Sequence, residues 1–363
     1  MDRIIALLAV LIGQSILTAC VAPRGAATVS PSGYAYNEAI AQTKSEQLLL
    51  NLVRLKYRDA IVFMDIDGVT TQHQYGATLS AEAFLPFQNA TRGTGLLVPG
   101  IGTSETPTIV YKPLDGSQFA QDMLAPITPE TIVLLANSGW SIERLMACCM
   151  ERLGQLSNAP SASGPTPDTI PNNARFREAT RLMRDLQRTE KVHVERLPGS
   201  EDEPVETVLH INAIDTPACA RLQTLLGSRD CEMRYQLVAK GGGLDQEELF
   251  AQTRTVLGAR YALSHVVEVP SAHKSGGLTT ASRVTSPETP DWLSFTSELF
   301  RVDSGIAPPA DAAVKVFYRD HWFWISDDDL ESKTTFNLLL FLLALQSAAS
   351  DGASPLLTID AGG

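Results

Sequence analysis

Three observations predict an α+β fold with small mixed or antiparallel sheets, packed helices and a buried Leu-rich helix near the C-terminus. First, segments whose apolar residues recur at helical spacing alternate with segments rich in β-branched and aromatic residues. Second, several β-rich segments come in pairs joined by short turns, which is typical of hairpins. Third, 44% of the 363 residues are hydrophobic, so the chain can bury a sizeable core.

The first twenty residues predict an export signal that ends at a lipidated cysteine. Ile4 to Leu17 is an almost uninterrupted apolar run after Arg3, and it is too short to span a bilayer. The sequence Leu17-Thr18-Ala19-Cys20 then resembles the lipobox of bacterial lipoproteins. The resemblance implies that residues 1–19 are a signal peptide and that Cys20 carries diacylglycerol. Because the next residue is not aspartate, it also implies sorting to the outer membrane.

The mature chain is predicted to begin with a tether. Residues 20–33 are small, nearly uncharged and contain Pro and Gly, which is typical of a flexible linker. Asn37 to Arg58 carries its apolar residues on one side at helical spacing, so we expect a helix. Ile61 to Phe87 and Leu96 to Tyr111 have strand composition, and an exposed loop tip is expected between them.

Two capped helices are predicted next. Thr128 is a suitable N-cap for a helix that runs to about Asn137, because proline and an acidic residue follow it. Ser141 caps a second helix, on which Arg144 is expected to lie away from the core. The apolar side of that second helix consists of Ile142, Leu145, Met146, Cys149 and Leu153.

A proline-rich stretch at residues 158–173 is the predicted boundary within the folded part. Its four prolines lie among Ser, Thr and Gly, which is typical of a linker or a long surface loop. The boundary would separate an N-terminal α+β region, 34–157, from a C-terminal α+β region, 174–363.

The C-terminal region is predicted to alternate helices and strands. We expect helices at Arg175 to Arg188, Asp215 to Gly227 and Arg254 to Val267. We expect strands at Val192 to Leu197, Val205 to Ile211, Met233 to Ala239 and Glu248 to Thr253. The glycine run Gly241-Gly242-Gly243 lacks the spacing of a dinucleotide-binding turn, so we interpret it as a hairpin loop.

An aromatic hairpin is predicted near the C-terminus. Ala313 to Tyr318 and His321 to Ile325 are β-rich and are separated by two residues only. Alternation puts Trp322 and Trp324 on one face and Phe323 on the other. We expect both faces to be covered by the protein, and the alternative is a partner-binding surface.

Asp327-Asp328-Asp329 precedes a predicted helix from Leu330 to about Ala349. Carboxylates are favoured at a helix start, so capping explains them, and the alternative is a Ca²⁺ or Mg²⁺ site. Phe336 to Leu345 is apolar on nearly all sides and too short to cross a bilayer, which predicts a buried central helix. A last strand is expected at Pro355 to Ile359.

Catalytic motifs are absent from the sequence. It contains no nucleophile elbow, phosphate-binding loop, His-Glu-x-x-His or Cys-x-x-Cys, so we predict no catalytic residues and no cofactor. A metal site is also not predicted, because no histidine lies four residues from another and the fold alone would have to assemble one. The histidines are His73, His193, His210, His265, His273 and His321.

Four cysteines besides Cys20 would meet an oxidising periplasm, and the sequence leaves three pairings open. Cys148 and Cys149 point about 100° apart on a helix and would not bond each other. Cys149 lies on the apolar side and is expected to be a buried thiol. Cys219 and Cys231 are the one pair that we predict as a candidate disulfide.

The charge pattern excludes one class of partner and suggests another. A formal net charge of −12 argues against wrapping of nucleic acid. Two basic stripes could contact anionic headgroups or an acidic partner, or be solvated faces in which Asp185 pairs with neighbouring arginines. The stripes are Arg54 and Arg58 with Lys44, and Arg177, Arg181, Arg184 and Arg188.

Three blocks resemble a family of uncharacterised proteobacterial lipoproteins: Gln47 to Asp59, Ser138 to Arg144 and His321 to Lys333. The resemblance implies compartment and fold but no activity. We therefore expect a lipid-anchored protein on the periplasmic face of the outer membrane that binds or scaffolds an envelope protein. The alternative is a periplasmic hydrolase with a site near Asp327 to Asp329.

Overall fold

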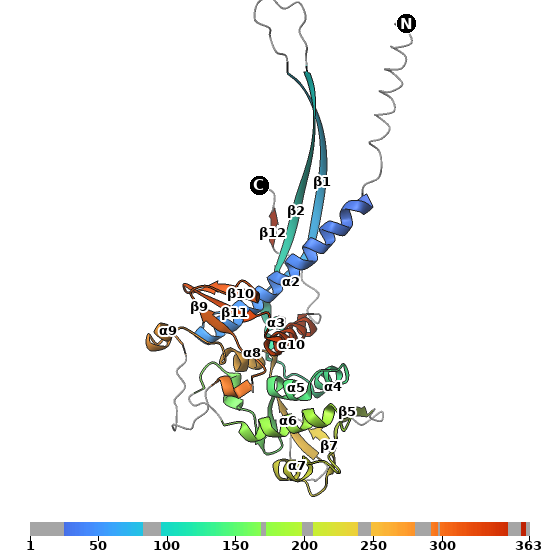
Figure 1. The fold of residues 1–363 in the computed structure, drawn as a ribbon, viewed down its shortest axis with the longest axis vertical. Helices are drawn as coiled ribbons and strands as arrows, with labels where there is room; N and C mark the ends of the chain where they lie inside the picture. The colour runs from blue at the N-terminus through green and yellow to red at the C-terminus, as the bar shows by residue number, and fades with distance from the viewer. Residues whose placement is uncertain are drawn as a thin grey trace, which may run out of the picture. The chain divides into compact units, whose positions relative to one another are not determined.

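The computed structural model describes residues 25–82, 96–167, 172–197, 206–238, 248–279, 292–296, 298–347 and 357–360. The chain forms two compact units, 1–44 and 45–363. The second unit combines helices with small mixed and antiparallel sheets, so the predicted α+β fold is confirmed (Figure 1). None of the helices in these ranges is long and apolar enough to cross a membrane.

Helix α2 spans Gly25–Tyr57 and begins well before the predicted start at Asn37. Residues 25–33, which their composition assigned to a flexible tether, are therefore helical. A helix that is already nucleated adds residues at little cost, which composition alone does not reveal. In the second unit, the predicted apolar side of α2 is buried, including Leu49 and Leu52.

Strands β1 (Met64–Glu82) and β2 (Leu96–Pro113) form a long antiparallel ladder, as their composition predicted. The first residue of β1 pairs with the last residue of β2, and the ladder is about 60 Å long at about 3.3 Å per residue. Strand β12 (Leu357–Asp360) pairs with the other edge of β2 (Figure 1). The predicted loop tip lies outside the described residues.

A six-stranded sheet has the order β4-β3-β8-β7-β6-β5. Its strands are β3 Met150–Leu153, β4 Leu156–Ser157, β5 Val192–Leu197, β6 Glu206–Asn212, β7 Glu232–Val238 and β8 Glu248–Thr253. The predicted hairpin at Gly241 to Gly243 is wrong, because β7 and β8 are parallel, with Gln236 opposite Glu248. The position of β8 is fixed by its antiparallel pairing with β3, a contact distant in sequence.

Two helices near this sheet begin at the cap residues that the sequence predicted. The Thr128 side chain accepts a hydrogen bond from the Thr131 amide, and the Ser141 side chain accepts one from the Arg144 amide. The helix that contains Cys149 ends there, so Leu153 is buried in a strand instead. The helices are α3 Gly116–Leu124, α4 Pro129–Asn137, α5 Ile142–Cys149, α6 Ala174–Gln187, α7 Cys219–Leu226, α8 Val256–Ser264 and α9 Ser271–Ser275.

The third sheet is formed by β9 (Asp303–Gly305), β10 (Ala312–Tyr318) and β11 (His321–Ser326), with β11 in the middle. Strands β10 and β11 are the predicted hairpin. Its two turn residues have positive φ, 48° at Arg319 and 63° at Asp320, as the tightest hairpin turns require.

The last long helix, α10 (Leu330–Ser347), is not buried on all sides as its composition predicted. Leu338 and Leu339 are fully buried, whereas Phe341 is 54% exposed and Leu345 is 50% exposed. Neighbouring elements, α3 and α8 among them, pack against part of the helix surface and leave a stripe of it in solvent.

The boundary predicted at residues 158–173 lies within the second compact unit. The two compact units meet at Lys44 and Ser45 instead. The Asn158 side chain is buried and donates to the carbonyls of Ala147 (2.9 Å) and Met150 (2.8 Å), and the buried Asn173 side chain donates to Asn158 Oδ1 (3.0 Å). Buried amides thus join Asn158 and Asn173, the two ends of this stretch, to each other and Asn158 to α5 and β3, contacts that proline content does not predict.

Candidate functional site

The outer side of the β9-β10-β11 sheet carries an aromatic face formed by Phe317, Trp322 and Trp324. Phe317 is 54% exposed, and both tryptophans are half-buried. Phe317 lies opposite Trp322 across the hairpin, with their ring centroids 5.3 Å apart. Three large rings at the surface of one small sheet exceed what single exposed apolar residues would contribute, and such surfaces are typical of contact sites.

The other side of the same sheet faces the core. Val314, Val316, Phe323 and Ile325 point inward and are buried, with Phe323 completely inaccessible. The predicted alternation of the two faces is therefore confirmed, but the protein covers the outer face only in part, because Phe317 is exposed while Trp322 and Trp324 are partly covered. Antiparallel sheets commonly have one face packed on the core and the other turned toward solvent.

Gly305 shapes the aromatic face. It lies opposite Trp322, and a Cβ added to it would come within 3.1 Å of the ring of Trp324. The Trp324 ring therefore packs closely against Gly305. A side chain at position 305 would require this ring to shift by a few tenths of an ångström, so the glycine allows the close packing.

A polar network fixes the turn beside the aromatic face. Asp59, just after α2, accepts hydrogen bonds from the Tyr318 hydroxyl (2.6 Å) and the Arg319 guanidinium (2.9 Å). That guanidinium also lies over the rings of Tyr57 and Tyr318. Burial disfavours the Asp59 carboxylate, but the hydrogen bonds from Tyr318 and Arg319 outweigh it and lower the pKa of Asp59.

Tyr57 extends this network to α9. Its hydroxyl lies 2.7 Å from Nδ1 of His273, whose ring meets that of His321 edge to face at 4.8 Å. Burial is the main cause that raises the pKa of Tyr57 to about 12, and burial with the nearby His321 lowers the pKa of His273. The tyrosine thus stays a neutral hydroxyl, and the network acts as a clamp between three distant segments.

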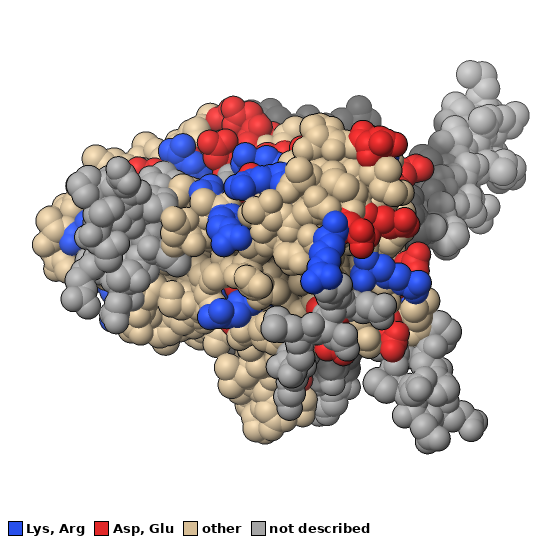
Figure 2. Space-filling view, turned by 90° about the horizontal axis from the view of Figure 1, so that it is seen from below, with Lys and Arg blue, Asp and Glu red and all other residues tan. Residues whose placement is uncertain are grey.

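The basic stripe on α6 is largely engaged by its neighbours. Arg184 donates to Gln187 Oε1 (2.7 Å), Arg188 pairs with Asp185 (3.2 Å), and Arg181 lies 3.8 Å from Glu143. Figure 2, seen from the end where α6 lies in Figure 1, shows Lys and Arg side chains interspersed with Asp and Glu. This is a mixed, solvated face, with Glu143 rather than Asp185 as the partner of Arg181.

The remaining predicted basic residues occupy different surroundings. Arg54 lies on the half-exposed side of α2 within hydrogen-bonding distance of Asn51 (3.5 Å), and Arg58 is the exposed residue that ends the helix. Arg177 is partly buried on α6, and burial lowers its pKa. Arg54 thus lies on α2 and Arg58 directly follows it, whereas Arg177 lies on α6 with the other arginines of that stripe.

The aspartates before α10 act as a helix start. Asp329 accepts a hydrogen bond from the Ser332 amide (2.9 Å) and one from its hydroxyl (2.6 Å), and Asp327 pairs with Lys333 (2.5 Å). In the described part of the chain, no group of three or more His, Cys, Asp or Glu side chains is arranged to hold a metal ion. Of the carboxylates proposed for a hydrolase, Asp329 thus caps the helix and Asp327 pairs with a lysine.

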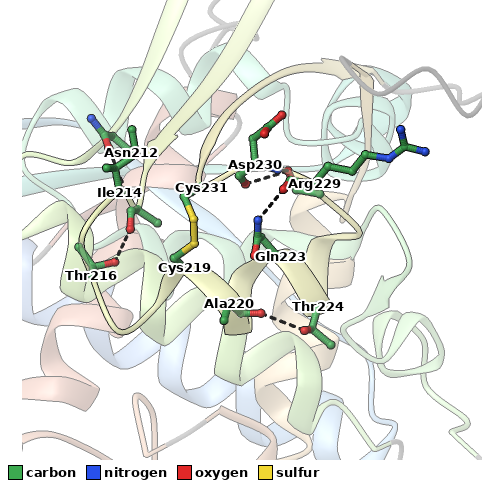
Figure 3. Close-up of a disulfide and its surroundings, with 12 residues drawn as sticks. Asn212, Ile214, Thr216, Cys219, Ala220, Gln223, Thr224, Arg229, Asp230 and Cys231 are labelled. Carbon is green, nitrogen blue, oxygen red and sulfur yellow. Dashed lines mark hydrogen bonds between the residues drawn. A yellow bond between two sulfur atoms is a disulfide. The ribbon is translucent and has the colours of Figure 1, made fainter.

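Cys219 and Cys231 form the disulfide that the sequence singled out (Figure 3). The bond joins the first residue of α7 to the residue just before β7. Cys148 and Cys149 are buried free thiols, as expected for Cys149. The hydrogen bond with Cys148, together with burial, holds the pKa of Cys149 well above its usual value, so Cys149 is not a reactive thiolate.

One polar cluster could not be found from sequence spacing. His193 and His210 lie opposite each other on β5 and β6, with Nε2 and Nδ1 3.1 Å apart, and His210 Nε2 lies 3.3 Å from Glu232 on β7. The pairing of strands brings these side chains together. Sequence spacing gave no signal for this pair, because the two histidines are 17 residues apart and on different strands.

Comparisons of the chain with protein-family models, with curated proteins and with solved structures found no match.

Proposed function

We propose that the chain is a lipid-anchored lipoprotein on the periplasmic face of the bacterial outer membrane and that it binds or scaffolds other envelope components. The Leu-Thr-Ala-Cys sequence that ends at Cys20 supports the anchor. The disulfide between Cys219 and Cys231 supports an exported protein, because disulfides persist in oxidising compartments. Two or more acyl chains would hold the folded part at the membrane surface.

The aromatic face is the observation that carries the binding role. Tryptophan and phenylalanine rings supply much of the energy of protein interfaces when they become buried by a partner. The Phe317 and Trp322 rings already contact each other and are backed by a rigid, buried sheet face, so little ordering remains to be done on binding. Three of the α6 arginines, Arg181, Arg184 and Arg188, are instead engaged by neighbouring side chains, so we place the contact at the sheet.

A site-specific cross-link tests this function. A photoactivatable phenylalanine analogue placed at Phe317 in the full chain should give, in intact cells, one adduct of defined mass. The same probe at Thr224, which is exposed on α7, should not give that adduct. Adding Trp322→Ser to the Phe317 probe should abolish the adduct while leaving protein levels unchanged. Identical adducts from both probe positions would contradict the proposal.

A further inference from the structure

A second surface feature is an apolar cavity of about 400 Å³ between the start of β1, α3 and α8 in the second unit. Its walls include Ile61, Val62, Phe63, Phe119, Met123 and Leu257. At its mouth, Val62 is 53% exposed and Leu124 is 61% exposed. This volume is within the range of small-molecule sites, and the walls suit a hydrocarbon chain.

A buried arginine lies directly behind this wall. The Arg260 side chain is fully buried, with its guanidinium over the ring of Phe63 at 4.6 Å and Nη1 3.4 Å from Met123 Sδ. Leu257, which also lines the cavity, is on α8 one turn before Arg260. The cation therefore contacts two wall residues of the cavity and projects from the same helix as a third.

Arg260 lacks the oxygen acceptors that the buried arginines Arg144 and Arg254 have. Arg144 donates to the carbonyl of Glu331 (2.7 Å) and to its carboxylate, and Arg254 donates to backbone carbonyls and to Ser163. Nε and Nη2 of Arg260 are buried and have no hydrogen-bond partner in the described part of the chain. Burial lowers the pKa of Arg260 to about 10, so the group is still a cation at neutral pH. An unpaired buried cation is costly to a fold.

The two unpartnered nitrogen atoms of Arg260 indicate which chemical group would pair with them. Nε and Nη2 form one edge of the planar guanidinium, which is the edge that binds the two oxygens of a carboxylate side by side. The one polar contact of Nη1, the thioether of Met123, is a weak acceptor on a flexible, unbranched side chain. Met123 also lines the cavity, so the guanidinium and the cavity share this wall residue.

We infer that this cavity binds an amphiphile with a hydrocarbon chain and one carboxylate, with the carboxylate paired to Arg260 and the chain held by the apolar walls. The exposed Asp115 in the lining disfavours a negative headgroup at the mouth and so favours the inward orientation. The site is separate from the aromatic face, and this inference does not depend on the proposed function.

Photoaffinity labelling of the full chain in phospholipid nanodiscs tests the inference. The probes are two twelve-carbon chains with the same diazirine, one a carboxylate and the other an alcohol. The carboxylate should label peptides from residues 61–63 and 113–124 at least tenfold more than the alcohol does. In Arg260→Met, whose folding is checked by circular dichroism, the carboxylate labelling should fall to the level of the alcohol.

A surface variant keeps the test valid if Arg260→Met does not fold. Leu124→Asp puts a charge at the mouth of the cavity and should abolish labelling by both probes. Leu134→Asp changes a similarly exposed leucine on α4, 62% exposed, and should leave labelling as in the wild type. Equal labelling by carboxylate and alcohol in the wild type, or full carboxylate labelling of Leu124→Asp, would overturn the inference.

Discussion

His265 is a single residue on which three segments of the second unit converge. Its ring stacks on Trp292 with a centroid distance of 4.6 Å, and its Nε2 bonds to the carbonyl of Gly164 (3.2 Å). Its own carbonyl accepts a hydrogen bond from the buried Lys56 (2.6 Å). Burial, followed by the charge of Lys56, lowers the pKa of His265 from 6.5 to about 4, so the folded protein keeps this imidazole neutral.

This lowered pKa predicts a loss of stability in mild acid. Between pH 6.5 and about 4 the unfolded chain binds a proton at His265 that the folded chain does not bind. The free energy of unfolding should fall through this window by about 1.4 kcal/mol per pH unit from this group. In urea titrations from pH 4.5 to 8, His265→Gln should lose most of that slope, whereas a change at the more exposed His193 should not. An unchanged slope in His265→Gln would exclude this explanation.

The burial of positively charged side chains was not predictable from the sequence. Helical spacing put Arg144 outside the core, yet its side chain is buried and binds the carboxylate and carbonyl of Glu331. Lys56, Arg254 and Arg260 are also buried, although charged side chains are rarely buried unless they are paired. Each is held by acceptors or rings from segments distant in sequence, and these partners appear only in the folded chain.

At the level of elements, helix starts and tight turns could be predicted from the sequence, because they depend on interactions between residues that are close in the chain. Thr128 and Ser141 begin helices because their side chains bond amides three residues on, and the two-residue turn at Arg319 and Asp320 follows from hairpin geometry. The parallel pairing of β7 and β8 was not predictable in this way. It depends on β3, about a hundred residues earlier in the chain.

Helix α10 provides a stability test with a matched control. Leu339 is 1% exposed and Leu345 is 50% exposed on the same helix. Leu339→Ala leaves a cavity in the core and should cost about 2–5 kcal/mol, whereas Leu345→Ala should cost less than about 1 kcal/mol. Chemical denaturation of the two variants measures the difference. Similar losses of stability in both variants would contradict this prediction, because they would mean that Leu345 is also buried in solution.

The link between α7 and β7 depends on the disulfide. Cys219 and Cys231 are 12 residues apart, and cross-linking a loop of this length is worth about 3 kcal/mol in chain entropy. The double variant Cys219→Ser, Cys231→Ser should lose about 2–4 kcal/mol in denaturant titrations. Reductant should destabilise the wild type by a similar amount and leave the double variant unchanged. A further loss in the reduced double variant would indicate another disulfide.

At the scale of the whole molecule, the chain joins a predicted membrane anchor to a folded unit that presents an aromatic face. The sequence supplied the fold class and the candidate anchor at Cys20, because export signals and hydrophobic periodicity are local patterns. The sequence placed the division of the chain at residues 158–173, whereas the compact units meet at Lys44. The burial of Asn158 and Asn173, at the two ends of that stretch, depends on tertiary contacts.

Lipidation at Cys20 is the measurement on which the proposed function most directly depends. Cells grown with an alkyne-bearing fatty acid should label the wild-type protein and place it in the membrane fraction. Cys20→Ala should carry no label, while Cys148→Ala, which removes a buried thiol, should be labelled as the wild type is. Equal labelling of the wild type and Cys20→Ala would contradict the lipoprotein proposal.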